Sequence, residues 1–310
     1  MKAIVMNRYG GADLLDLVEV TKPVPTIRQI LVRVVASAVD PGNVKRAAGL
    51  MRGHVPDLVF PWIPGMAVAG VVEEIGAGVS EFSAGDEVYG FSAVGGGYGE
   101  YVILEPEAIG IKPRTLSYGQ AASLAVAGQT ALLALDAACL SAGQRVLVLG
   151  AGGAVGSVVA QLAVQAGAYV IAVCRTRSAA RLRSLGVHDV LISEGDVIDL
   201  SVHEVDAVVD AVGGDQAKKA YEVLKPGGVL VALTEMPSQT LAQDHNVRAV
   251  MVKTQSKTSH LERLATTYDE GKITPFVGVT YSLADASLAW NAYCAKTIEG
   301  KIVIAVAESN

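Results

Sequence analysis

Residues 146–163 read Val146-Leu147-Val148-Leu149-Gly150-Ala151-Gly152-Gly153-Ala154-Val155-Gly156-Ser157-Val158-Val159-Ala160-Gln161-Leu162-Ala163. A short apolar run leads into closely spaced glycines and then into a segment of helical character. Glycine suits such a turn because the backbone bends sharply, approaches a pyrophosphate closely and leaves the first N–H groups of the helix free for the anion. A second apolar run at 169–173 completes the pattern. The stretch therefore predicts a Rossmann dinucleotide site, with a glycine-rich turn between core elements as the alternative.

The turn itself supplies the first set of predicted cofactor contacts. They are Gly150, Gly152, Gly153, Ala154, Val155 and Gly156. A bare spacing of glycines is weak evidence for a nucleotide site, but the strand before it and the helix and strand after it make the prediction much stronger.

The segment after the second apolar run reads Val173-Cys174-Arg175-Thr176-Arg177-Ser178 and contains no carboxylate. A site for NAD places Asp or Glu here to hold the ribose hydroxyls. Guanidinium groups instead form charge-assisted bonds to a 2′-phosphate. Arg175, Arg177 and Ser178 therefore predict NADPH as the cofactor. The alternative is that the two arginines only solvate a loop.

Composition excludes several other classes of protein. The chain of 310 residues is 51% hydrophobic, has a net charge of −6 and contains no long run of Lys or Arg. It can bury a large core, while a nucleic-acid partner is not expected because no basic surface is available for the phosphate backbone. Cys139, Cys174 and Cys294 are far apart and odd in number, which favours reduced thiols in a cytoplasmic protein.

Two uncharged stretches, 115–135 and 146–174, are apolar enough to pass for membrane spans. Glycine and glutamine residues interrupt both, so we expect buried strands and helices and no membrane partner. The first eight residues turn polar quickly and have no signal-peptide core.

The pattern of elements changes twice along the chain. Short strands and turns up to about residue 112 predict a β-rich domain. Apolar strands then alternate with helical segments between about 116 and 254, which predicts a parallel sheet covered on both faces. The last part returns to a strand near 277–279, a helical stretch at 283–295 and a final strand at 301–306.

Further motifs are spread over almost the whole chain. They are Ala38-Val39-Asp40-Pro41-Gly42-Asn43 (VNPxD-like), 60–72 (PxxPGxxxxGVV), 85–90 (GDxVxG), 98–102 (YAEY-like), 127–131 (GxTA-like), 224–228 (LxPGG) and 300–303 (GKIV). Together with the glycine turn they resemble the medium-chain dehydrogenase/reductase superfamily, and specifically its zinc-free quinone oxidoreductase branch.

The resemblance implies an α/β protein with a doubly wound Rossmann sheet and a GroES-like, β-rich catalytic domain. The catalytic domain is expected to comprise residues 1–115 with 272–310, and the Rossmann NADP-binding domain residues 116–271. We also expect cofactor contacts from Thr130, Val212 and Gly213. A homodimer joined through the edges of the Rossmann sheets is implied as well.

The zinc-dependent relatives carry a Cys near position 40 and a GHE motif after the PxxP turn. Here the matching residues are Asp40 and Gly65-Met66-Ala67, and no cysteine precedes Cys139. The thiolate and imidazole ligands that zinc prefers are therefore missing, and we predict no metal.

Asp40 and Asn43 are the predicted catalytic residues. The branch has Asn first and Asp second in this turn, and here the order is reversed. In such relatives the turn lies beside the nicotinamide and the substrate. The alternative role for Asp40 is to form the turn before Pro41. Candidate hydrogen-bond donors to the substrate are Asn43, Tyr98, His54 and the cofactor ribose.

Without a metal, the cofactor must deliver hydride to a carbon that is already electron-poor. The sequence therefore predicts NADPH-dependent reduction of a small electrophilic acceptor, a quinone or an α,β-unsaturated carbonyl. Two alternatives stay open: an enoyl thioester reductase of the same fold, and a non-catalytic NADPH-binding protein.

Overall fold

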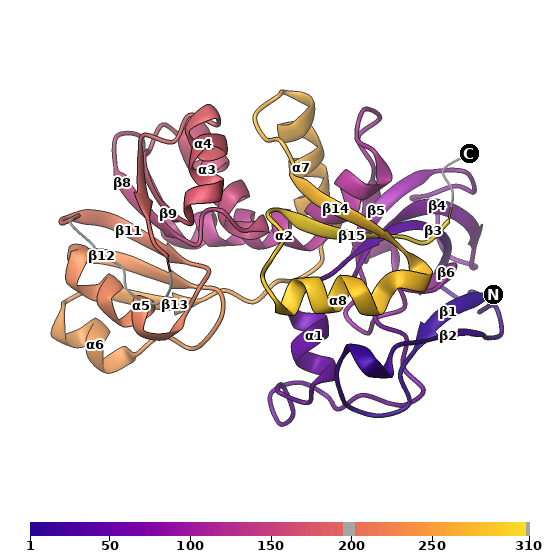
Figure 1. Ribbon diagram of the computed structural model, residues 1–310. Helices are drawn as coiled ribbons and strands as arrows, with labels where there is room; N and C mark the ends of the chain where they lie inside the picture. Colours follow the sequence, from indigo (N-terminus) through magenta and orange to yellow (C-terminus); the bar gives the residue numbers. More distant parts are fainter. Residues whose placement is uncertain (195–201, 308–310) are drawn as a thin grey trace. The chain divides into compact units, whose positions relative to one another are not determined.

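The structure is a computed structural model that describes residues 1–194 and 202–307. Its packing divides the chain into unit 1, Met1–Val126, Ser256–Glu270 and Pro275–Asn310, and unit 2, Ala127–Gln255 and Gly271–Thr274 (Figure 1). Residues 116–126 and 256–270 thus pack with unit 1, although the sequence suggested domain boundaries at 116 and 272. The reason for the second difference is the helix α7 (Thr258–Asp269), which packs on β7 (Ile109–Ile111) of unit 1.

Unit 2 is built on a six-stranded sheet in the order β10-β9-β8-β11-β12-β13. The strands are β8 (Arg145–Leu149), β9 (Tyr169–Cys174), β10 (Asp189–Ile192), β11 (Val205–Asp210), β12 (Leu224–Ala232) and β13 (Arg248–Met251). All of the pairs are parallel. From β8, the chain first adds strands on one side, β9 and then β10, and afterwards on the other side, β11 to β13. Doubly wound sheets bind ligands at such a switch point, here between β8 and β11, at the carboxyl ends of the strands.

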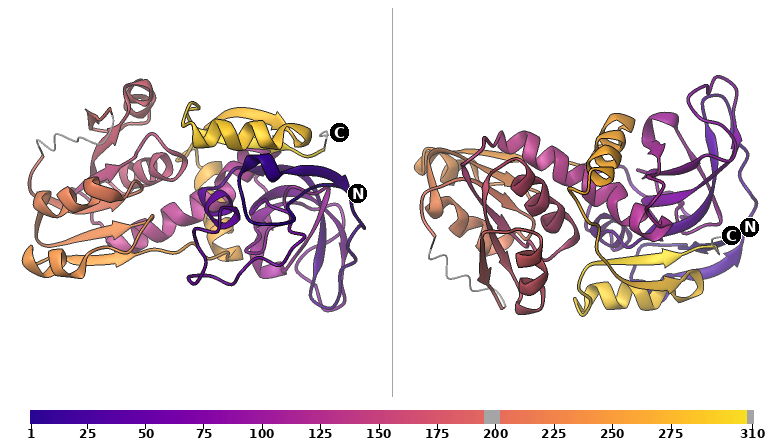
Figure 2. Two further views of the ribbon diagram at one scale, coloured as in Figure 1. Left: turned by 60° about the horizontal axis from the view of Figure 1, so that its bottom comes forward. Right: turned by 90° about the horizontal axis from the view of Figure 1, so that it is seen from above.

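Helices cover both faces of this sheet (Figures 1 and 2). On one side lie α3 (Ala154–Gln165) and α4 (Thr176–Ser184), and on the other α5 (Gly214–Lys219), η3 (Ala220–Val223) and α6 (Gln239–Asp244). The central strands are continuously apolar because neither face meets water, and all of Val146–Leu149 is fully buried. The predicted parallel sheet is confirmed.

The helix α2 (Tyr118–Ala138) begins in unit 1 and ends in unit 2. By length and composition alone it could cross a membrane, but 72% of its most apolar window is buried inside the protein. Such burial is what a core helix of a folded domain shows, and it accounts for the first uncharged stretch of the sequence.

Unit 1 contains a seven-stranded sheet in the order β14-β15-β3-β4-β5-β7, with β6 paired to β3. The strands besides β7 are β3 (Ile30–Ala38), β4 (Ala67–Ile75), β5 (Glu87–Phe91), β6 (Tyr101–Leu104), β14 (Val277–Ser282) and β15 (Lys301–Ala305). A separate pair joins β1 (Lys2–Val5) to β2 (Asp16–Glu19). The remaining elements are η1 (Ala12–Leu14), α1 (Pro41–Ala47), η2 (Pro106–Ala108), η4 (Leu283–Asp285) and α8 (Ala286–Cys294).

Both ends of the chain contribute to unit 1. The strand β15 pairs antiparallel with β3, with Ile304 opposite Ser37. One core cluster joins residues from the two ends, Ile4 and Met6 from the first and Trp290 and Ile302 from the last. Segments from near both ends of the chain therefore pack together in unit 1.

Candidate cofactor and active site

The glycine turn between β8 and α3 is shaped by close backbone contacts. Gly150 has φ +76°, a conformation that L side chains rarely adopt. A Cβ built on Gly156 would lie 2.4 Å from the carbonyl oxygen of Gly150 and 2.9 Å from the Cα of Ala151. Any side chain at 156 would thus push the first turn of α3 away from Gly150 and Ala151.

The N-terminus of α3 is free of side-chain capping. Its N-cap residue is Gly153, which makes no side-chain hydrogen bond to the helix, and Ala154 and Val155 form the first turn. The first N–H groups of a helix have no partners within the helix, and the helix dipole favours an anion beside them. The turn therefore fits a pyrophosphate, because its glycines leave space and its N–H groups are donors.

Arg181 of α4 supports this turn and was not identified from the sequence. Its guanidinium donates to the hydroxyl of Ser157 at 2.9 Å and to the carbonyl oxygen of Gly152 at 3.1 Å. Helical spacing alone did not distinguish it from the other arginines of this basic helix. Only the packing of α4 beside α3 shows that it holds the glycine turn.

Residues after β9 surround the N-terminus of α4. Arg175 is the N-cap residue and Arg177 lies in the first turn, both exposed, whereas Ser178 is buried. A Cβ on Gly152 would lie 2.6 Å from the hydroxyl of Ser178, so this side chain packs directly against the glycine turn. The structure therefore brings the predicted 2′-phosphate residues to the same end of the sheet as the turn.

One carboxylate lies beside these residues and was missed. Oε1 of Glu194, which follows β10, accepts a hydrogen bond from the backbone N–H of Thr176 at 2.8 Å. In the sequence, the segment directly after β9 contains no carboxylate. Glu194 comes 18 positions later and reaches α4 because β10 pairs with β9.

The carboxyl end of β11 lies next to the glycine turn. A Cβ on Gly150 would meet Cγ2 of Val212 at 2.8 Å, so this predicted cofactor residue contacts the turn. Gly213 is buried, and its N–H and that of Val212 donate to Oδ1 of Asp210 at 3.0 and 2.9 Å. Burial raises the pKa of Asp210, and these two N–H donors oppose that shift.

Thr130, also predicted to contact the cofactor, lies in α2 and is buried. Its hydroxyl is 2.5 Å from the hydroxyl of Thr254, which follows β13. The pair connects α2 to the same carboxyl end of the sheet.

In unit 1, the predicted catalytic residue Asp40 is the N-cap residue of α1 and is only 2% exposed. Its Oδ1 forms an ion pair with Nζ of Lys301, which is 6% exposed. Asp40 therefore has a structural partner as well as the turn position that the sequence suggested. Lys301 was quoted in the GKIV motif, but no local pattern showed that it pairs with a residue 261 positions away.

Asn43, the second predicted catalytic residue, lies in α1 and is fully buried. Its Oδ1 accepts from the N–H of Gly65 at 3.3 Å. Among the described residues, Nδ2 of Asn43 and Oδ2 of Asp40 have no hydrogen-bond partner. A buried polar atom without a partner is costly, so these two atoms are candidates for contact with a ligand.

The other candidate donors lie in different surroundings. The hydroxyl of Tyr98 is fully buried, donates to the carbonyl oxygen of Ala38 at 3.4 Å and accepts from Nε1 of Trp290 at 3.1 Å. Burial raises the pKa of Tyr98, which keeps the hydroxyl protonated. His54 is exposed, and its Nδ1 lies 3.2 Å from the carbonyl oxygen of Arg52.

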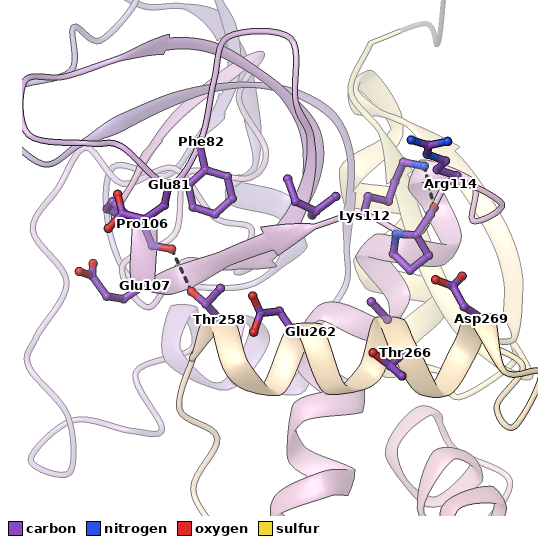
Figure 3. Close-up of a pocket in the computed structure, with 13 residues that line it drawn as sticks. Glu81, Phe82, Pro106, Glu107, Lys112, Arg114, Thr258, Glu262, Thr266 and Asp269 are labelled. Carbon is purple, nitrogen blue, oxygen red and sulfur yellow. Dashed lines mark hydrogen bonds between the residues drawn. The ribbon is translucent and has the colours of Figure 1, made fainter.

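A cavity of about 770 Å³ lies within unit 1, between α7 and the segment 106–114 (Figure 3). Its walls carry Phe82 and the carboxylates of Glu81, Glu107, Glu262 and Asp269. Lys112 and Arg114 line it as well, so its walls carry charges of both signs. Neither predicted catalytic residue lines it.

The chain combines a doubly wound sheet, whose glycine turn has no side-chain cap, with a GroES-like unit built from both ends of the chain. This combination defines the class of nicotinamide-dependent oxidoreductases. Residues 26–114 match the family described as "Alcohol dehydrogenase GroES-like domain", and residues 185–304 match "Zinc-binding dehydrogenase".

Individual relatives narrow the class. The chain is 32% identical to the chloroplast envelope quinone oxidoreductase homolog of Arabidopsis thaliana, over 97% of this chain and 95% of that one. A solved quinone oxidoreductase from Coxiella burnetii is 30% identical, covers 99% of both chains and has a TM-score of 0.91. The chloroplastic NADPH-dependent alkenal/one oxidoreductase of A. thaliana is 37% identical over 76% of this chain, and the match spans 62% of that relative's length.

The chain belongs to the medium-chain dehydrogenase/reductase superfamily, in its quinone oxidoreductase-like branch. The predicted family and fold class are confirmed, and membership implies a nicotinamide cofactor.

Replacing Gly156 by Ala is expected to weaken NADPH binding. The new Cβ would meet the backbone of Gly150, and overpacking of this kind costs roughly 1–3 kcal/mol, or about 5- to 150-fold in affinity. Calorimetric titration with NADPH measures the loss. Gly119→Ala in α2 is the matched control, because its nearest neighbour would be 3.5 Å away. Equal affinities in both variants would remove the turn from the cofactor site.

Replacing Lys301 by Met is expected to destabilise the protein by about 3–5 kcal/mol, because it leaves the buried Asp40 carboxylate without its counter-charge. Urea unfolding of the single variants and of the double variant Lys301→Met with Asp40→Leu forms a mutant cycle. The double variant should recover much of the loss. If the changes in the free energy of unfolding of the two single variants simply added up in the double variant, Asp40 and Lys301 would not be energetically coupled.

Proposed function

We propose that this protein is an enzyme that uses NADPH to reduce a quinone or an α,β-unsaturated carbonyl without a zinc ion. The observation that carries the proposal is the uncapped glycine turn of α3 beside Arg175 and Arg177 at the start of α4. Bound NADPH would supply a hydride to the electron-poor carbon of the acceptor.

The residues of unit 2 fit this cofactor in two places. The N–H groups at the start of α3 are donors for the pyrophosphate, and Arg181 holds the carbonyl oxygen of Gly152 in position. Arg175, Arg177 and Ser178 supply positive charge and a hydroxyl for the 2′-phosphate. The preference of the protein for NADPH over NADH rests on these three side chains.

The residues of unit 1 supply the groups for the acceptor. Asn43 donates from Nδ2 to the oxygen on which negative charge develops, since this nitrogen has no other partner among the described residues. Asp40, held by Lys301, begins α1 and fixes the turn that presents Asn43. The proton that completes the reduction comes from solvent, because the Tyr98 hydroxyl is committed to the core.

The names of several relatives support this substrate class. They include quinone oxidoreductases and an alkenal/one oxidoreductase. Quinones and alkenals are electron-poor acceptors. The chain spans only 62% of the length of the latter and of the tomato 2-methylene-furan-3-one reductase, so their activities reach this protein as proposals. An enoyl thioester reductase and a non-catalytic NADPH-binding protein are the alternatives for the assay.

Zinc independence is part of the proposal. Asp40, Met66 and Ala67 stand where zinc-dependent relatives have their ligands. The described part of the chain holds no group of three or more His, Cys, Asp or Glu placed to bind a metal ion. We further propose a cytoplasmic homodimer in which two copies join through β13, one of the two edge strands of the parallel sheet.

Purified protein is expected to oxidise NADPH with quinones and enones, and to retain this activity after treatment with a chelator. A panel of quinones, enones and crotonyl-type thioesters, followed by absorbance, identifies the acceptor class. Turnover with thioesters alone would favour the enoyl reductase, and tight NADPH binding without turnover the non-enzyme. About one tightly held zinc per chain, with activity lost on chelation, would contradict the metal-free mechanism.

Replacing Arg175 or Arg177 by Ala is expected to lower kcat/KM for NADPH by about 10- to 150-fold and to leave NADH nearly unaffected. One charge-assisted bond is worth roughly 1.5–3 kcal/mol, and salt should reduce the effect because both side chains are exposed. The ratio of kcat/KM for the two cofactors measures it. A parent ratio near one, or equal losses for both cofactors, would show that the arginines only solvate the loop.

A further inference from the structure

The pairing of β9 with β10 places a carboxylate at the start of α4. Ile192 is opposite Cys174 in the parallel register, and the N–H of Ser193 donates to the carbonyl oxygen of Cys174 at 2.9 Å. Glu194 lies two residues after Ile192, and Thr176 lies two residues after Cys174, so the two residues are close to each other. Oε1 of Glu194 accepts the Thr176 N–H at 2.8 Å.

This N–H belongs to the first residue of a nine-residue helix, whose N-cap residue Arg175 makes no side-chain cap. Such an N–H points toward an anion, and the helix dipole favours negative charge there. The hydrogen bonds from Thr176 and the charges of Arg175 and Arg177 lower the pKa of Glu194, so its carboxylate is ionised at neutral pH. Glu194 thus already occupies an anion position beside the two arginines.

We propose that Glu194 is a specificity-determining residue. Its carboxylate occupies the anion position at the start of α4, so the 2′-phosphate of NADPH must displace this carboxylate in order to bind. Glu194 thereby reduces the preference of the protein for NADPH over NADH. This inference rests on the proposed function, in which Arg175 and Arg177 bind that phosphate.

The competition follows from charge and exposure. A phosphate monoester carries nearly two negative charges at neutral pH and three acceptor oxygens, so it outcompetes a single carboxylate for the Thr176 N–H and for the positive charge of Arg175 and Arg177. Glu194 is exposed and can turn toward solvent, but its charge stays close to the phosphate and repels it. NADH has a hydroxyl at this place, which carries no charge and does not compete.

Glu194→Gln tests the inference because the amide oxygen still accepts the Thr176 N–H while the charge is removed. NADPH is expected to bind about 2- to 5-fold more tightly, the size typical of an exposed charge pair, and NADH is expected to bind as before. Calorimetric titration of the apo protein with each cofactor measures both affinities. Glu222→Gln, an exposed glutamate of the same unit, is the matched control and should change neither.

Unchanged or weaker NADPH binding in Glu194→Gln would overturn the inference. Weaker NADH binding would also overturn it, because Glu194 would then hold the ribose hydroxyls. The double variant Arg175→Ala with Arg177→Ala separates this failure from that of the proposed function. If the double variant loses NADPH affinity while Glu194→Gln gains none, only the inference fails. If the double variant keeps its NADPH affinity, the cofactor preference fails, and the inference with it.

Discussion

The close approach of α3 to β8 is the constraint on which the cofactor site depends. A methyl group at Gly156 would overlap the backbone of Gly150, and one at Gly152 would overlap Ser178. Because these positions lack side chains, three segments converge on one turn: the start of α3, the start of α4 with its arginines, and the end of β11 with Val212. The backbone thus provides both the space and the donors for a dinucleotide.

Unit 1 depends on a different interaction, the buried ion pair between Asp40 and Lys301. It links the start of α1 to β15, so that distant parts of the chain are held together in one unit. Ionised groups tolerate burial only when paired, which ties the position of α1 to that of β15. The neighbouring Asn43 then has a fixed amide group: its Oδ1 accepts a hydrogen bond from the N–H of Gly65, and its Nδ2 has no partner within the described parts of the chain.

The two helix N-termini of the cofactor site differ in their electrostatics. The start of α3 has no side-chain cap among the described residues, and its backbone N–H groups suit the pyrophosphate that every nicotinamide dinucleotide carries. The start of α4 combines two arginines with a carboxylate. In the proposed site, the groups that would bind the pyrophosphate are therefore not the groups that would select between the two cofactors.

The sequence by itself determined the strands of the parallel sheet, the glycine turn and the family, because apolar runs and turn glycines reflect constraints that act within a few residues. It also placed Arg175 and Arg177, since both follow a recognisable strand. Only the tertiary structure decided that Lys301 pairs with Asp40, that the Tyr98 hydroxyl lies in the core and that Glu194 caps α4. Each of these contacts joins segments that are distant along the chain, and strand register and packing decide which side chains meet there.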